Sequence, residues 1–319
     1  MGVWRTGAAR ISVSLVLVGV LLWNTDRAKL VTTIGALDPA LFASAAVCYL
    51  LAQTLSAVRW QVLLRSEGIA VSLGRLVLFY LEGTFFNLLL PTLIGGDVVR
   101  AHRIYVRAQR NEAAVASVLV DRLSGLIALL AVAWGSLAAD RHAVGAWPVL
   151  SFSAALVLGA VVISRRGVKA LVRRVLGRPT LARVEEGVTS FYQAIARYGS
   201  RRGILAQVCG LSLVIQVIVI LGHFLVGRAL GLSTPFVVFL GLIPLATIVA
   251  MIPISVGGLG VRDGAMVYLF GRAGLPFADA LGLSLGWFFV MVVCSLPGGL
   301  VFVLRDVRKE PQDSRVLQR

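Results

Sequence analysis

Long apolar runs, separated by short clusters of arginine, are the main feature of the chain. A helix needs about 20 mostly apolar residues to cross a bilayer. We expect six such spans, at positions 11–23, 40–58, 113–139, 144–164, 203–227 and 278–304. The first resembles a signal peptide, but no small-x-small cleavage site follows it, and we interpret it as an uncleaved span.

Two shorter apolar runs, 76–90 and 236–252, each lead into a Pro/Gly turn and a more polar arm. Arginines flank the first unit on both sides, which predicts that it enters and leaves on the same side of the membrane as a re-entrant hairpin. The second arm of the second unit ends near Arg272. The second run is long enough to cross a thin region, so eight full spans is the alternative.

The two hairpin units share one motif. The pattern P-x3-G-G-x3-R runs from Pro91 to Arg100 and again from Pro253 to Arg262. The two copies are therefore 162 positions apart. Paired Gly/Pro-interrupted segments in the two halves of a membrane protein indicate the central site of a transporter. Such a break in a helix is tolerated at membrane depth where it lines a cavity or is buried in protein.

The arginine clusters predict opposite orientations for the two units. Counting crossings from the basic flanks places the first hairpin on the inner side and the second on the outer side. We therefore predict an inverted repeat within one integral membrane domain, residues 1–319, with repeat A at about 40–139 and repeat B at about 203–304.

The composition is that of a membrane protein, and its charge indicates contact with lipid. Hydrophobic residues make up 58% of the 319 positions, and mean hydropathy is +0.88. The formal charge of +16 comes mostly from arginines beside apolar runs, where they indicate topology and lipid contact rather than nucleic-acid binding. We expect residues 165–202 to form a basic amphipathic segment on anionic inner-leaflet lipids. Both termini are then cytoplasmic, in a bacterial cytoplasmic (inner) membrane.

The three cysteines and three histidines are scattered without the spacing of a metal or redox site, so we expect no metal and no cofactor. Ionisable residues at membrane depth are costly and are candidates for function. The candidates for contact with a substrate are Asn87, Gly95, Gly96, Asp97, Arg100, Asp121, Arg122, Gly257, Gly258, Arg262 and Asp263. Glu82 is a possible proton carrier, although carboxylates neutralised by arginine have the same sequence signature.

Spacing on a helix predicts how these charges pair. Asp97 and Arg100, at i and i+3, share a helix face. Adjacent residues point apart, so Asp121–Arg122 and Arg262–Asp263 are expected to find partners elsewhere, most simply across the interface between the repeats. Arg262 is then the freer of the two motif arginines.

Each second arm begins directly after Gly-Gly, so its unpaired amides and positive dipole end are expected to face the middle of the membrane. That arrangement favours an anion such as a phosphate. The other interpretation is that the glycines only allow helices to pack closely.

Three motifs carry a family resemblance. N-x3-P-x3-G-G-D-x2-R at 87–100, D-R-x2-G-L at 121–126 and G-G-L-G-V-R-D at 257–263 resemble the flippase-like family formed by the transmembrane domain of lysylphosphatidylglycerol synthase and its stand-alone, UPF0104-type relatives. Asp263 stands where that family usually has glutamate. The resemblance implies movement of lipid, because aminoacyl transfer in the fused enzymes belongs to a separate soluble domain.

These observations favour a transporter over an enzyme. The expected function is translocation of an anionic or zwitterionic phospholipid, or a polyprenyl-phosphate-type lipid, between leaflets. The alternatives are a membrane-embedded transferase that acts on a lipid and a non-catalytic partner of a separate lipid synthase. The sequence contains no G-x4-G-K-[ST] loop for ATP, so we expect movement to be passive, coupled to an ion or driven by a partner.

Overall fold

The computed structural model describes residues 35, 37–89, 95–108, 111–139, 149–151, 153–154, 197–199, 201–251 and 259–307. Every regular element among these residues is a helix, which confirms the predicted all-α class. The predicted spans at 11–23 and 144–164, and the basic segment 165–202, lie wholly or mostly outside the described residues.

Four long helices in the described part of the chain have the length and hydropathy of membrane spans. They are α3 (Pro39–Ser66), α6 (Asn111–Ala139), α11 (Arg202–Ala229) and α14 (Phe277–Val307). Each matches a predicted span, although α3 continues eight residues beyond position 58. Arg59, which the sequence places at the membrane surface, is therefore a buried residue inside a helix.

Four shorter helices form two hairpins. They are α4 (Leu73–Leu89), α5 (Gly95–Ala108), α12 (Phe236–Ala250) and α13 (Val261–Arg272). Within each pair the helices pack against one another. The 15 residues of α12 extend about 22 Å at 1.5 Å per residue, less than the ~30 Å hydrocarbon core, so hairpins describe these units better than two further spans.

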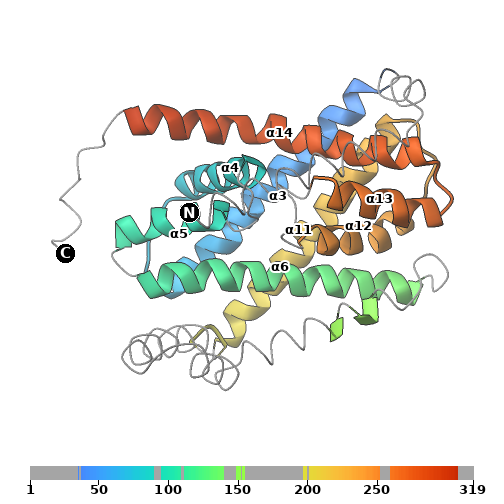
Figure 1. The fold of residues 1–319 in the computed structure, drawn as a ribbon. Helices are drawn as coiled ribbons and strands as arrows, with labels where there is room; N and C mark the ends of the chain where they lie inside the picture. The colour runs from blue at the N-terminus through green and yellow to red at the C-terminus, as the bar shows by residue number, and fades with distance from the viewer. Residues whose placement is uncertain are drawn as a thin grey trace, which may run out of the picture.

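The two halves of the fold are inverted copies. In Figure 1, α3 and α11 run in opposite directions, as do α6 and α14, and the two hairpins lie toward opposite ends of the molecule. The packing has the same symmetry: α4 packs on α14 as α12 packs on α6, α5 on α6 as α13 on α14, and α3 on α4 as α11 on α12. The central pair, α3 and α11, pack on each other.

Local chemistry repeats as well. Gly68 follows α3 with φ 76° and Gly231 follows α11 with φ 75°, a left-handed conformation that glycine adopts without strain. At both ends a backbone amide reaches back five residues, from Ile69 to the Leu64 carbonyl and from Leu232 to the Gly227 carbonyl, at 2.9 Å. These equivalent helix ends are 163 positions apart, which extends the repeat well beyond the shared motif.

Each hairpin lies on its own hydrophobic cluster. The first cluster contains Trp60, Phe79 and Ile104, and the second contains Phe239 and Phe270 together with residues of α3, α11 and α14.

The inverted arrangement predicts that equivalent loops face opposite sides of the membrane. Ser72, between α3 and α4, and Ser233, between α11 and α12, are both exposed. In a protein whose three native cysteines are replaced, Ser72→Cys and Ser233→Cys should react with a membrane-impermeant maleimide from opposite sides of oriented vesicles. Reaction of both cysteines from one side only would contradict the inverted repeat.

Candidate functional site

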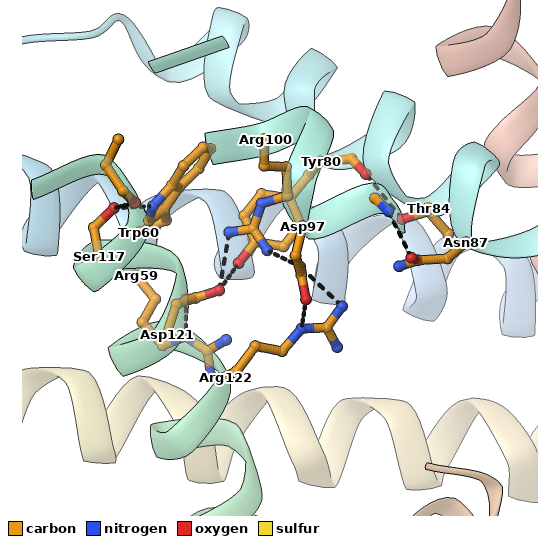
Figure 2. Close-up of polar contacts among 12 residues, drawn as sticks. Arg59, Trp60, Tyr80, Thr84, Asn87, Asp97, Arg100, Ser117, Asp121 and Arg122 are labelled. Carbon is orange, nitrogen blue, oxygen red and sulfur yellow. Dashed lines mark hydrogen bonds and ion pairs between the residues drawn. The ribbon is translucent and has the colours of Figure 1, made fainter. Parts of the chain in front are cut away.

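Arg100, on α5, is the centre of a buried ion-pair network (Figure 2). Its guanidinium lies 3.7 Å from the centre of the Tyr80 ring and 4.3 Å from the centre of the Trp60 ring. The indole N–H of Trp60 donates to Ser117 Oγ at 3.1 Å, which fixes that ring. Stacked aromatic faces stabilise a cation that has lost its water.

Asp121, on α6, neutralises two arginines at once. Its carboxylate lies 2.8 Å from Arg59 Nε and 2.9 Å from Arg100 Nη2. The Tyr80 hydroxyl also donates to this carboxylate. Asp121 is only 1% exposed, so these donors replace the water that a carboxylate needs at this depth.

Asp97 was expected to hold Arg100, but it pairs more closely with Arg122. Its two oxygens accept from Arg122 Nε at 2.7 Å and from Nη2 at 3.0 Å, whereas Arg100 Nη1 lies at 3.3 Å. The Arg122 side chain is 44% exposed and that of Asp97 14%. Loss of Asp97 would therefore release Arg122, while Asp121 continues to hold Arg100.

The prediction that the charges close across the repeat interface is wrong for Asp121 and Arg122. Their partners come from α3 and α5, within the same half. Across the interface Arg59 bonds instead to an uncharged group, since its Nη1 donates to Ser212 Oγ of α11 at 2.8 Å.

The prediction that Arg262 and Asp263 point apart is also wrong. Arg262 Nη2 lies 2.9 Å from Asp263 Oδ1 in the first turn of α13, and Ser284 of α14 donates to the same oxygen at 2.5 Å. This is possible because the side chain of Arg262 is long enough to turn back toward its neighbour. Arg262 thus has one carboxylate partner in the described network, whereas Arg100 has two.

The amides near the start of each second arm are occupied by side chains. The Gly96 amide donates to Asn87 Oδ1 at 2.8 Å, and the Gly260 amide donates to Asp263 Oδ2 at 2.8 Å. A Cβ at Gly96 would lie 1.9 Å from the Gly83 carbonyl oxygen, so this glycine permits close packing of α4 and α5. These two amides are therefore not donors to a phosphate, and the arginines are the stronger candidates.

The sequence also proposed Gly95, Gly257, Gly258 and Glu82 as functional residues. Gly257 and Gly258 lie outside the described residues. Gly95 is buried at the start of α5. Glu82 is fully buried and accepts from Arg103 Nε at 3.0 Å, and it is not among the residues lining the cavity described next. Its suggested role as a proton carrier stays a prediction.

A cavity of about 380 Å³ lies between the two halves and is lined by arginines of both. Arg59, Arg100, Arg122 and Arg262 line it together with Asp97 and Asp121. Counting Asp263, which is bound to Arg262, four arginines and three aspartates meet here. The formal balance of one positive charge favours an anionic group in the cavity.

Sequence reasoning missed several residues of this site. Arg59 was interpreted as a topology signal, and Tyr80, Gln53, Gln216, Thr247, His223 and Trp287 line the same cavity without having been singled out. The paired glutamines and threonines occur at one spacing in the two repeats, 163 positions, and an alignment of the halves would have found them.

Comparison with known proteins agrees with this architecture. Residues 7–298 match the family described as the lysylphosphatidylglycerol synthase TM region. The chain belongs to this family. The match covers repeat A and nearly all of repeat B, and it confirms the family resemblance of the sequence motifs.

Two known proteins are similar to this chain over most of its length. The chain is 26% identical to "Glycosyltransferase AglD" of Haloferax volcanii, a match that covers 88% of this chain and 50% of the relative. It is also 26% identical to a "UPF0104 membrane protein" of Methanothermobacter thermautotrophicus, over 84% of this chain and 86% of the relative. The chain thus spans half the length of AglD and most of the UPF0104 protein.

The network predicts different costs for its two cavity-lining aspartates. Asp121→Asn leaves buried Arg59 without its carboxylate partner and Arg100 with only the longer contact to Asp97. Removal of one partner from a buried ion pair costs about 3–5 kcal/mol. Asp97→Asn makes the same chemical change beside the half-exposed Arg122, so it should cost much less. Thermal unfolding in detergent should show a large fall in midpoint for Asp121→Asn and a small one for Asp97→Asn. Equal midpoints would show that Asp121 does not hold the helices together.

Proposed function

We propose that this membrane protein moves a phosphate-bearing lipid between the leaflets, with the lipid headgroup passing through the cavity between the repeats. The observation that carries this proposal is the meeting of four arginines from both halves in one cavity. Arginine binds phosphate through two parallel N–H donors, which contact two phosphate oxygens at once.

The inverted repeat supports transport. Transporters built from inverted repeats hold their substrate near the bilayer midplane, at the repeat interface, and expose it to each side in turn by movement of one unit against the other. Here both hairpins contribute to the cavity, α4 and α5 from one half and α12 and α13 from the other. A headgroup held there would be reached from either side after a modest rearrangement.

The state of the carboxylates favours transport over group transfer. A transferase that acts on a lipid would need a carboxylate or histidine free to accept a proton from the attacking group. Asp97 and Asp121, which line the cavity, are each held by two arginines. The histidine in the lining, His223, contacts the Val219 carbonyl oxygen through Nδ1 at 2.9 Å and stacks on the Trp287 ring. The name of the AglD relative therefore does not decide the activity of this chain, which spans half of that protein.

Reconstitution of the purified protein by itself tests this proposal. Proteoliposomes containing lipids with a tail-attached NBD group report leaflet exchange through bleaching by dithionite, which reaches the outer leaflet only. Exchange of an anionic phospholipid well above the rate in protein-free vesicles supports the proposal. Equal rates with and without protein would reject autonomous lipid translocation and leave the transferase and the synthase-partner alternatives.

Arg262→Lys tests the role of the guanidinium. Lysine keeps the charge but lacks the planar fork, so exchange of anionic lipid should fall about tenfold, ~1.4 kcal/mol, the upper range for one net hydrogen bond. Arg272→Lys is the matched control because it makes the same change at an exposed position of the same helix. Parental exchange rates in both variants would remove Arg262 from the phosphate site.

A further inference from the structure

The cavity has a neutral polar part that the arginine network does not use. Gln53 of α3 and Gln216 of α11 line it, as do Thr84 of α4 and Thr247 of α12. Within each pair the residues are 163 positions apart, the spacing that also relates Gly68 and Gly231. The two pairs therefore occupy equivalent positions of the inverted repeat, and both halves present the same amide and hydroxyl groups to the cavity.

The hydrogen bonds of these residues show what they can offer a ligand. Thr84 Oγ1 donates to the Tyr80 carbonyl at 2.9 Å, and Thr247 Oγ1 donates to the Ile243 carbonyl at 2.8 Å. Each hydroxyl proton is thus used within its own helix, and the oxygen keeps acceptor capacity. The Tyr49 hydroxyl, which also lines the cavity, lies close to Thr84 and Gln53. Gln216 Nε2 donates to the Gly125 carbonyl at 3.2 Å, and the two carboxamides together supply both N–H donors and carbonyl acceptors.

This combination of groups matches an alcohol. A hydroxyl group donates one hydrogen bond and accepts others, so it is satisfied by threonine oxygens and carboxamides together. The four residues are half-buried, and a site whose polar groups are withdrawn from water in this way disfavours a ligand that lacks the hydroxyl, because the site groups then lose their partner.

The same cavity is a poor environment for an ammonium group. An ammonium group only donates, and at this depth it needs an anion close by. Both aspartates that line the cavity are already in contact with two guanidiniums, Asp97 with Arg100 and Arg122, and Asp121 with Arg59 and Arg100. A second cation at either carboxylate would meet these arginines at close range.

We propose that the cavity selects a lipid whose phosphate carries a hydroxylated headgroup, of the glycerol or sugar type, over one whose phosphate carries an amine. This inference rests on the proposed function and makes it more specific. The arginines of both halves bind the phosphate, and the symmetric belt formed by Gln53, Gln216, Thr84 and Thr247 binds the hydroxyl groups. Because the belt has the same composition in both halves, it offers the headgroup equivalent partners whichever side is open.

Three lipids with the same NBD-labelled acyl chains separate the two recognition elements. Phosphatidylglycerol carries phosphate and hydroxyls, phosphatidylethanolamine carries phosphate and an amine, and phosphatidic acid carries phosphate alone. The parental protein should exchange phosphatidylglycerol about tenfold faster than either of the others, after subtraction of the rate in protein-free vesicles. The rise in thermal unfolding midpoint in detergent, with each lipid added, provides a binding measurement that does not require transport.

The double variant Thr84→Val/Thr247→Val removes both hydroxyl oxygens and keeps side-chain shape. Exchange of phosphatidylglycerol should fall about tenfold, to the rate of phosphatidic acid, while the phosphatidic acid rate stays unchanged. Thr84→Ser/Thr247→Ser should restore the preference. Thr54→Val is the matched control, because Thr54 Oγ1 makes the same bond to its own helix, to the Leu50 carbonyl at 2.9 Å, but does not line the cavity.

The possible outcomes separate this inference from the proposed function. Equal exchange and equal stabilisation for phosphatidylglycerol and phosphatidylethanolamine would overturn the inference and leave lipid translocation intact. An equal fall for phosphatidylglycerol and phosphatidic acid in the valine variant would also overturn it, since the threonines would then be structural. Selective stabilisation by phosphatidylglycerol without any exchange would support the headgroup preference and reject translocation.

Discussion

The rest of the structure depends on one carboxylate, that of Asp121, held between two arginines at membrane depth. Its contacts with Arg59 and Arg100, and with the Tyr80 hydroxyl, bring α3, α4, α5 and α6 to one point. Charges this deep are costly and are tolerated when they are paired with an opposite charge. The first hairpin can therefore lie at this depth with Arg100 at its centre, and the Arg59–Ser212 hydrogen bond connects this point to the second half.

The protein combines a symmetric scaffold with an asymmetric charge distribution. Helix packing, the glycine-ended spans and the neutral belt repeat in both halves, but Ser284 stands 163 positions after Asp121, where a second bridging carboxylate would be. Asp263 supplies the missing charge locally, beside Arg262. One half of the cavity thus contains three arginines paired with two aspartates, and the other presents an arginine with a single carboxylate partner. We infer that a phosphate held by arginines of both halves has Arg262 as its more adaptable contact.

The sequence predicted the architecture well because its signals were local and periodic. Run lengths, the shared motif and the arginine clusters were sufficient for the four described spans and the two hairpins, and the motifs were sufficient for the family. Pair contacts were harder to predict, because they depend on how helices distant in sequence approach one another. Arg59 follows an apolar run and matched the pattern of a surface arginine, whereas its burial is set by α6 and α11. The Gly-Gly turns suggested an anion site, but Asn87 and Asp263 occupy nearby amides, a choice that depends on side-chain geometry.

The central claim is that a lipid headgroup occupies the cavity between the repeats, and photo-crosslinking tests it most directly. A phosphatidylglycerol analogue with a diazirine in its headgroup would be incorporated into proteoliposomes together with the protein. The proteoliposomes would be irradiated, and the labelled peptides would be identified by mass spectrometry. The account predicts labels on cavity-lining residues of both halves, including Gln53 and Gln216, and competition by unlabelled phosphatidylglycerol. Labels confined to outward-facing positions such as Phe289 and Leu300, which are exposed on α14, would contradict it.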